Sequence, residues 1–373
     1  MRGPIVITGG GTGGHVFAME AIAERLLARG VAAHQVRYVG SRRGQEATLL
    51  AGGPVALTLL PGRGIRRSWS ARAVRENVGA VGALVGALLV ALVEIGRWRP
   101  RAVVSVGGYA SFAVALAAVC WRRPLVLVEL DAAPGLALRV LRRFAAQRCR
   151  AFGPDEPSAV VTGAPIRDTI AAVDRSHEAR VLVRSLQIPP IEPQRSVIVV
   201  MTGSLGATRV NQAVSDLAWR WADRADRTII HVTGRRDFEL VTSRRPSPGR
   251  LDYRIVDFAD MTDLWALADV AVCRAGSATL AELTALSIPS ILVPLPGMAQ
   301  HQSRNAYEMV RSGAARLIVD ADCDAVVLAR VLDEALTPIT LTAMADAAGR
   351  LARPAAADAI AAVVCGIGDA WRG

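Results

Sequence analysis

The 373-residue chain contains no lysine, and aromatic residues make up only 5% of it. Proteins that bind single-stranded nucleic acid stack bases on exposed rings, whereas this chain has few rings and no recognition-helix motif. We therefore expect no nucleic-acid partner. All 44 basic residues are arginine, which we attribute to codon usage, and the net charge of +11 leaves the protein strongly basic.

Cysteine is also scarce. The five cysteines of the chain are Cys120, Cys149, Cys273, Cys323 and Cys365. They are odd in number, scattered and free of any C-x-x-C pair, which argues against a disulfide framework and a zinc site and is typical of a reducing compartment. Residues 1–4 lead directly into an apolar strand, so we expect no signal peptide.

No hydrophobic run is long enough to cross a bilayer. The longest, residues 78–93, has 16 apolar or glycine residues, fewer than the roughly 20 that a spanning helix needs. We expect a buried helix or one that dips into a membrane surface. The flanking arginine and tryptophan residues are Arg63, Arg66, Arg67, Trp69, Arg72, Arg75, Arg97, Trp98, Arg99 and Arg101. Such flanks are typical of interfacial helices and favour peripheral membrane contact, with an ordinary core helix as the alternative.

The positive charge is concentrated in the first half of the chain. Residues 1–165 hold 21 arginines against 9 acidic residues, whereas residues 166–373 hold 23 against 24. A basic half next to a neutral half indicates a polyanionic partner, either anionic lipid headgroups or a phosphorylated substrate. The alternative is a solvated surface without a partner.

Short β-branched runs alternate with helical stretches along the whole chain. The expected strands are residues 5–8, 35–39, 56–60, 102–106, 125–130, 159–162, 196–201, 228–233, 254–256, 270–274, 290–293 and 315–318. Near-continuous apolar strands between helices predict parallel sheets covered on both faces. We expect an α/β protein of two doubly wound, Rossmann-like domains facing a cleft.

Breaks in the pattern locate the domain boundaries. We expect domains at residues 1–164 and 165–340, followed by alanine-rich helices at 341–373 that pack back on the first domain. A second break, residues 187–195, contains three prolines and precedes the strand at which the α/β pattern restarts.

A glycine-rich loop, Thr8 to His15, separates the first strand from a helix. It has five glycines, so its backbone N–H groups and the positive end of the helix can approach an anion such as a diphosphate. A histidine at this position can take a proton from a nucleophile. The spacing of Gly9, Gly11 and Gly14 also fits a dinucleotide site. No acidic residue ends the second strand, but Arg42 and Arg43 leave an NADP enzyme as a minor alternative.

Two further small-residue loops, residues 202–207 and 274–279, follow strands of the second half. Ligands of doubly wound sheets bind at the carboxyl ends of the strands. We therefore expect one anion-binding loop in the first domain and two in the second, an arrangement that suits an enzyme joining two phosphorylated substrates.

With these loops placed, six motifs occur in one order. They are residues 10–17, 107–109, 162–167, 203–207, 273–279 with Glu282, and 300–302 ahead of Asn305. From the first strand to about Leu351 the chain resembles the GT-B glycosyltransferases, and within them the bacterial transferases that convert lipid I to lipid II. The resemblance implies inverting transfer of N-acetylglucosamine from UDP-N-acetylglucosamine to the muramyl C4 hydroxyl of a polyprenyl-diphosphate-linked acceptor at the cytoplasmic face of the membrane, with no cofactor or metal.

The resemblance also implies roles for individual residues. The catalytic group would be His15, as the base or as the residue that steadies developing charge, with Glu129. The acceptor-side residues would be Thr12, Gly13, Gly14, Gly107, Gly108 and Tyr109. The donor-side residues would be Arg167, Ser204, Ser277, Ala278 and Thr279 at the diphosphate, Glu282 at the ribose, and His301 and Gln302 at the sugar. For Arg167 a structural ion pair is the alternative role, and for Glu282 a helix cap.

The chain departs from the family pattern at three positions. Asp131 stands where the family has a sugar-contacting asparagine, Ala18 where it has proline, and Leu205 where it has glutamine. An aspartate can accept hydrogen bonds from a sugar but cannot donate as an amide does. Two alternatives therefore stay open: a GT-B transferase acting on another lipid or natural product, and a nucleotide-sugar-binding protein without catalysis.

Overall fold

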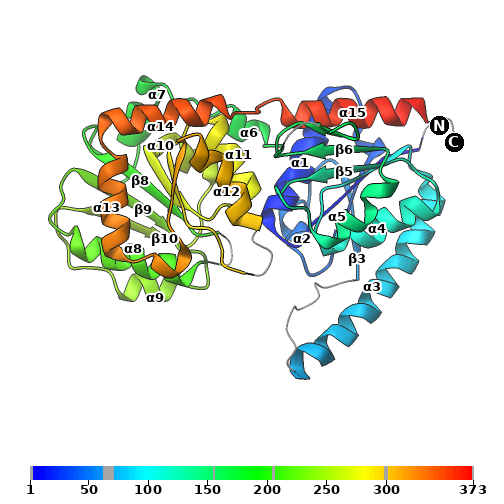
Figure 1. The fold of residues 1–373 in the computed structure, drawn as a ribbon, viewed down its shortest axis with the longest axis horizontal. Helices are drawn as coiled ribbons and strands as arrows, with labels where there is room; N and C mark the ends of the chain where they lie inside the picture. Colours follow the sequence, from blue (N-terminus) through cyan, green and yellow to red (C-terminus); the bar gives the residue numbers. More distant parts are fainter. Residues whose placement is uncertain (1–2, 62–70, 154–155, 204–205, 298–300, 372–373) are drawn as a thin grey trace. The chain divides into compact units, whose positions relative to one another are not determined.

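The structure is a computed structural model that describes residues 3–61, 71–153, 156–203, 206–297 and 301–371, without the side chains of residues 71–81 and 110. It divides the chain into two compact units, drawn on the right and left of Figure 1. Unit 1 comprises Met1–Asp168 and Arg353–Gly373, and unit 2 comprises Thr169–Ala352.

Unit 1 is built on a seven-stranded, fully parallel sheet of order β3-β2-β1-β4-β5-β6-β7. Its strands are β1 (Ile5–Thr8), β2 (Val36–Ser41), β3 (Ala56–Leu60), β4 (Ala102–Ser105), β5 (Leu125–Glu129), β6 (Gln147–Arg150) and β7 (Ala159–Val161). Every residue of β1, β4 and β5 is buried, as expected for strands covered on both faces. The order in which successive strands are added to the sheet reverses between β1 and β4, and doubly wound sheets bind ligands at such a point.

Six helices pack on this sheet. They are α1 (Gly13–Ala28), α2 (Glu46–Leu49), α3 (Ala71–Trp98), α4 (Tyr109–Cys120), α5 (Leu136–Leu141) and α15 (Ala356–Ala370). The last of these comes from the end of the chain and packs against α1 and β4. Arg29, the residue directly after α1, and Asp358 on α15 form a bidentate ion pair of 2.7 and 2.9 Å that supports this packing.

Helix α3 contains the long apolar run and extends away from the sheet at its amino-terminal end (Figure 1). Ala91 and Ile95 are buried against α4, whereas Val85, Leu89 and Val93, spaced four residues apart, are 51, 60 and 66% exposed. The helix is therefore apolar on its outer face as well as its inner face. Among the described residues, no helix is both long and apolar enough to cross a membrane.

Unit 2 repeats the architecture with a six-stranded parallel sheet of order β10-β9-β8-β11-β12-β13. Its strands are β8 (Ser196–Met201), β9 (Arg227–Val232), β10 (Asp252–Val256), β11 (Val270–Cys273), β12 (Ser290–Leu292) and β13 (Ala315–Leu317). Its helices are α7 (His177–Ser185), α8 (Thr208–Arg220), α9 (Phe238–Ser243), α10 (Met261–Leu267), α11 (Ser277–Ala285), α12 (His301–Arg311), α13 (Ala325–Ala335) and α14 (Pro338–Arg350). The short helix α6 (Asp168–Ala171) lies where the chain passes from unit 1 to unit 2.

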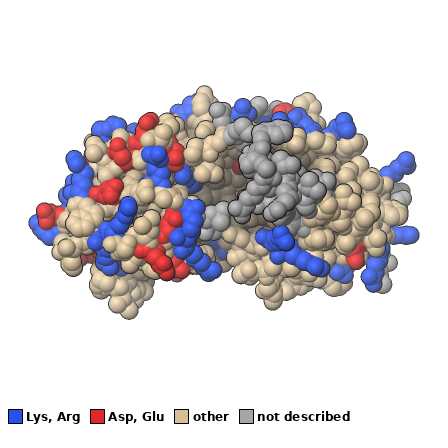
Figure 2. All heavy atoms as spheres, turned by 90° about the horizontal axis from the view of Figure 1, so that it is seen from below, with Lys and Arg blue, Asp and Glu red and all other residues tan. Residues whose placement is uncertain are grey.

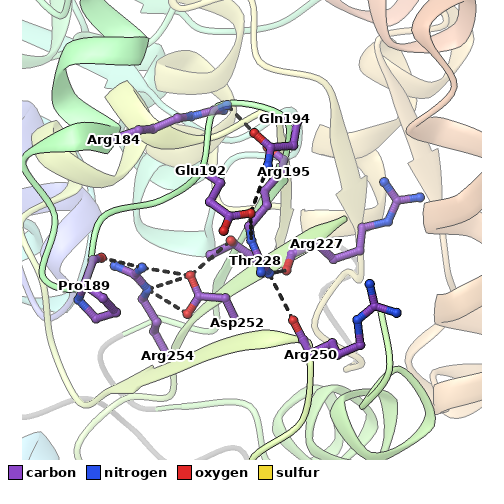
Figure 3. A network of polar contacts seen from close by, with 10 residues as sticks. All are labelled: Arg184, Pro189, Glu192, Gln194, Arg195, Arg227, Thr228, Arg250, Asp252 and Arg254. Carbon is purple, nitrogen blue, oxygen red and sulfur yellow. Dashed lines mark hydrogen bonds and ion pairs between the residues drawn. The ribbon is translucent and has the colours of Figure 1, made fainter. Parts of the chain in front are cut away.

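The proline-rich segment 187–195 is hydrogen-bonded to residues in and next to the strands β9 and β10 of unit 2 (Figure 3). Arg195 donates to the carbonyl oxygens of Arg227 at 3.0 Å and Arg250 at 3.2 Å. Arg254 donates to the Pro189 carbonyl at 2.7 Å and to Asp252. Arg195 lies at the amino ends of the strands, away from the carboxyl ends at which ligands bind, so its role is structural.

The twelve predicted strands are all present. A further strand, β6 (Gln147–Arg150), was not predicted. Its sequence, Gln-Arg-Cys-Arg, lacks the apolar run by which a buried parallel strand is identified. Arg148 is nevertheless buried, because it pairs with Glu129 on the neighbouring strand β5. A buried ion pair thus takes the place of hydrophobic side chains in this strand.

Candidate functional site

The acceptor-side candidates lie at the carboxyl ends of β1 and β4 in unit 1. Gly108 has a positive φ of +83°, and a Cβ there would overlap the carbonyl of Gly10, so the two glycine loops are in backbone contact. Only glycine permits both the conformation and the close approach. The structure therefore brings together the loop before α1 and the loop before α4.

His15 lies in the first turn of α1, next to both loops. Its Nδ1 is 2.8 Å from Oγ1 of Thr12, the residue that precedes the helix. A methyl group added to Gly107 would lie 3.4 Å from Nε2, so the other ring nitrogen faces the β4 loop. Burial lowers the pKa of His15, and the charge of Asp131 opposes this by raising it. A lowered pKa favours the neutral imidazole, which is the form that a general base requires.

Tyr109 and Gly11 contact two residues, Ser41 and Glu46, that were not predicted as site residues. The Tyr109 hydroxyl donates to Oγ of Ser41 at 3.3 Å, and its ring lies against Gly11. Oε1 of Glu46, the first residue of α2, accepts hydrogen bonds from the N–H groups of Gly11 at 3.1 Å and Ser41 at 3.3 Å. No carboxylate directly follows the second strand in the sequence. In the structure, however, the side chain of Glu46 lies at the end of that strand and accepts from the Ser41 N–H. The two glycines before Glu46, Gly40 and Gly44, were the available signal.

Glu129, predicted to be catalytic, is the last residue of β5 and is 2% exposed. Its two carboxylate oxygens accept hydrogen bonds from Nε and Nη2 of Arg148 at 2.9 and 3.1 Å, and Arg150 lies 3.6 Å away. Both carboxylate oxygens are thus engaged by guanidinium groups of the neighbouring strand. The geometry thus favours a structural role in which Glu129 joins β5 to β6 and supports the loop that carries Asp131.

Arg167, a donor-side candidate, belongs to unit 1. Its guanidinium carbon lies 4.3 Å from the centre of the Phe17 ring on α1, a cation–π geometry. The same guanidinium lowers the pKa of Glu20, although burial raises that pKa by more. The described contacts of Arg167 are therefore structural ones within unit 1, the Phe17 ring and the charge of Glu20.

In unit 2 the donor-side candidates gather at the amino end of α11, which follows β11. Ser277, Ala278 and Thr279 form its first turn, whose N–H groups have no acceptor within the helix. Glu282 lies further along α11 and does not cap it, because the helix already begins at Ser277. Its Oε2 accepts a 2.8 Å hydrogen bond from the buried indole N–H of Trp265, a partner that the sequence analysis missed.

Of the motif at residues 300–302, His301 and Gln302 open α12, whereas residue 300 lies outside the described residues. Oε1 of Gln302 accepts a hydrogen bond from the backbone N–H of Leu295 at 2.8 Å, which fixes the side chain against the loop after β12. Asn305 donates to the Ala275 carbonyl at 3.3 Å and so ties α12 to the β11 loop. His301 is the first residue of α12. Ser204, another donor-side candidate, lies outside the described residues.

The two units thus each carry small-residue loops at the carboxyl ends of a doubly wound sheet. Within the described part of the chain, no three His, Cys, Asp or Glu side chains are grouped as metal ligands. The architecture is that of the GT-B glycosyltransferases. The chain belongs to glycosyltransferase family 28, because residues 5–149 match the N-terminal domain of that family and residues 197–361 match its C-terminal domain.

Similar proteins cover almost the full length of the chain. A protein of Alkalilimnicola ehrlichii, named UDP-N-acetylglucosamine--N-acetylmuramyl-(pentapeptide) pyrophosphoryl-undecaprenol N-acetylglucosamine transferase, is 36% identical over 97% of this chain and 98% of its own length. A protein of the same name from Anaeromyxobacter dehalogenans is 37% identical over 96% of this chain and 91% of its own.

Solved structures agree on the fold. The crystal structure of Acinetobacter baumannii MurG superimposes with a TM-score of 0.75 at 24% identity and covers 98% of this chain and 99% of its own. CalG4, the calicheamicin glycosyltransferase, superimposes with a TM-score of 0.70 at 15% identity and covers all of both chains. Since acceptors differ widely among proteins of this fold, the acceptor has to be inferred from sequence relatives and from the site.

Proposed function

We propose that this protein is an inverting glycosyltransferase that moves N-acetylglucosamine from UDP-N-acetylglucosamine to the muramyl C4 hydroxyl of undecaprenyl-diphospho-muramoylpentapeptide, converting lipid I to lipid II. The observation that carries the proposal is His15, held by Thr12 and lying between two glycine loops, in a chain that matches transferases of that name along nearly its full length. The reaction belongs to peptidoglycan synthesis and therefore to cell-wall biogenesis, cell shape and division.

In the proposed mechanism His15 takes the proton of the C4 hydroxyl as its oxygen attacks the anomeric carbon of the donor sugar. The bond from that carbon to the UDP oxygen breaks, so the configuration inverts and UDP leaves. Thr12 orients the imidazole: if Nδ1 donates its hydrogen to Oγ1, the lone pair of Nε2 is free to accept the proton.

The other residues would bind the substrates. The N–H groups at the start of α1, from Gly13 and Gly14, and those near Tyr109 would hold the acceptor diphosphate. The first turn of α11 and Arg167 would hold the leaving diphosphate, whose charge grows as the bond breaks. The carboxylate of Glu282, steadied by Trp265, would accept from the ribose hydroxyls, while Gln302, His301 and Asp131 would contact the sugar.

The test is to mix the purified protein with UDP-N-acetylglucosamine and a short-chain lipid I analogue, and to follow UDP release beside a control without acceptor. Acceptor-dependent release with a new disaccharide supports the proposal. Release with other lipid or natural-product acceptors but not with the muramyl lipid would favour a transferase of different specificity. Binding of UDP-N-acetylglucosamine without turnover on any acceptor would favour a non-catalytic binding protein.

We also propose that unit 1 contacts an anionic membrane as a peripheral protein at the cytoplasmic face. The exposed α3 stripe of Val85, Leu89 and Val93 adjoins Trp121, which is 49% exposed and donates from its indole to the Leu92 carbonyl at 2.8 Å. The residues directly after Trp121 in the sequence line an open depression of about 510 Å³. Its basic and aromatic lining includes Arg122, Arg123, Arg143, Phe144 and Trp371. Apolar side chains next to arginines suit an interface with anionic headgroups.

The surface charge of the described residues is consistent with this placement. On the visible face of unit 1, at the right of Figure 2, arginine occurs with little acid, whereas on unit 2 both charges are mixed. Co-sedimentation with vesicles containing phosphatidylglycerol should exceed that with neutral vesicles, and Leu89→Asp should reduce it. Ile339→Asp, which changes an even more exposed apolar residue of unit 2, is the control. Equal loss in both variants would contradict the assignment to α3.

A further inference from the structure

Glu46 is a fully buried acidic residue beside the glycine loop of unit 1, the loop that is proposed to bind an anionic diphosphate. It has 0% exposure and opens the short helix α2. Its Oε1 accepts hydrogen bonds from two backbone N–H groups, those of Gly11 and Ser41. Bonds from amides to a charged carboxylate are stronger than those between neutral groups. Glu46 therefore holds the first glycine loop to the end of β2.

The Glu46 side chain fits in this position because three neighbouring backbone residues are glycines without a Cβ. A Cβ at Gly10 or Gly44 would overlap the carboxyl group of Glu46, and one at Gly40 would lie 2.8 Å from its Cγ. Three glycines from two separate segments thus surround one carboxylate. A surface glutamate with an incidental hydrogen bond would not need such space, so the loops are built around Glu46.

The contacts of Glu46 extend to the second glycine loop through Ser41. The backbone N–H of Ser41 is held by Glu46, while its side-chain oxygen accepts from the Tyr109 hydroxyl at 3.3 Å and from the Arg43 N–H at 3.2 Å. The ring of Tyr109 in turn lies against Gly11. The two acceptor-side loops and the end of β2 are therefore joined around a single buried carboxyl group.

We propose that Glu46 is a positioning residue of the acceptor site, resting on the proposed function above. Its carboxylate occupies the Gly11 amide, so the N–H groups left for the acceptor diphosphate are those of Gly13 and Gly14, which have no acceptor within α1. By fixing Gly11 and Ser41 it sets the position of these amides and of Tyr109. Loss of Glu46 weakens acceptor binding and leaves donor binding in unit 2 unchanged.

The test measures KM and kcat for each substrate separately in wild type, Glu46→Ala and Glu46→Gln. In the alanine variant the acceptor KM should rise by about tenfold or more, as for the loss of charge-assisted hydrogen bonds, with the donor KM within about twofold of wild type. The glutamine variant keeps an oxygen that accepts from both amides and should recover most of the acceptor affinity. Tyr109→Phe, which removes only the hydroxyl contact to Ser41, should show a smaller rise of the acceptor KM.

Controls separate this role from a loss of stability. Leu26→Ala truncates a fully buried core residue of α1 away from the loops, and it should lower Tm without changing the acceptor KM. Hydrogen exchange of a peptide covering residues 9–17 should speed up in Glu46→Ala, while exchange of residues 208–220 stays unchanged. If Glu46→Ala does not fold, Glu46→Gln and Tyr109→Phe carry the test.

Two results would overturn the proposal. One is an unchanged acceptor KM in a folded Glu46→Ala protein, and the other is a glutamine variant that is folded but as impaired as the alanine variant. An inactive wild-type protein would instead refute the proposed function, so the two failures are distinguishable. A rise of donor and acceptor KM by the same factor would also contradict a role confined to the acceptor loops.

Discussion

Nδ1 of His15 lies 2.8 Å from the hydroxyl oxygen of Thr12, the residue immediately before α1. This contact fixes the ring and directs Nε2 toward the β4 loop at Gly107. A histidine oriented by a partner on its own helix terminus, with a pKa lowered by burial, is suited to take a proton from a bound hydroxyl.

Replacement of His15 by alanine should lower kcat by at least about 100-fold, the usual contribution of a general base. Thr12→Val removes the partner of Nδ1 and should lower kcat to a smaller extent, without changing UDP affinity. Steady-state kinetics with both substrates, with UDP binding as the folding control, check this. A His15→Ala enzyme with wild-type turnover would exclude His15 as the base.

The acid limb of the pH profile should depend on Asp131. The pKa of His15 is lowered by burial and raised by the Asp131 charge, so removing that charge lowers it further. Because the base must be neutral, kcat/KM falls as pH drops through this pKa, and in Asp131→Asn the fall should occur at lower pH than in wild type. Profiles of kcat/KM from pH 4 to 8 measure the shift. A limb that moves to higher pH would contradict this electrostatic coupling.

The pair of Glu129 and Arg148 should contribute more to stability than to chemistry. Arg148→Ala leaves a buried carboxylate without its main partner and should lower the free energy of unfolding by about 3–5 kcal/mol. Replacing both residues, in Glu129→Leu with Arg148→Met, should recover part of this loss. Urea denaturation measures both, and Arg330→Ala, which breaks an exposed pair with Glu334, should cost no more than about 1 kcal/mol. Full stability in a folded Arg148→Ala protein would refute the structural role.

Glu282 should make nucleotide binding depend on the ribose hydroxyls. Wild type should bind UDP about tenfold more tightly than 2′-deoxy-UDP, because a carboxylate accepts strongly from a hydroxyl. Glu282→Gln should reduce this preference, and Trp265→Phe, which removes the N–H that holds Oε2, should reduce it partly. Calorimetric titration of both nucleotides measures the ratio. An unchanged preference in Glu282→Gln would assign ribose recognition to another residue.

His231 should make unit 2 sensitive to acid. It is 0% exposed and bonded to Tyr253 at 2.8 Å and Asn211 at 2.9 Å, and burial lowers its pKa to about 3. The unfolded chain binds this proton near pH 6.5, so the stability contribution is complete above that pH and is lost as pH falls toward 3. His231→Gln should flatten stability between about pH 6.5 and 4, whereas His34→Gln, at an exposed site, should not. Equal pH dependence in wild type and His231→Gln would contradict this.

The sequence by itself determined the two doubly wound sheets and the loops at their carboxyl ends. Continuous apolar strands such as β1 and β11 can be satisfied only inside a parallel sheet, and small-residue loops before helices have few uses other than binding anions. His15 was predicted from its place behind the glycine loop, and Gly107 and Tyr109 from the resemblance to the family; the structure places all three near one another. The family followed from the order of the same motifs.

Only the tertiary structure decided which polar side chains are partners. Glu129 and Arg148 are 19 residues apart, and their pairing depends on the register of β5 against β6. Glu46 and Gly11 are 35 residues apart and meet because β1 and β2 are neighbours with their carboxyl ends at one edge. A local pattern carries the propensity of one segment, whereas the burial and pairing of a charge depend on what a distant segment places beside it. The roles of Glu129, Glu46 and Trp265 were therefore decided by the fold.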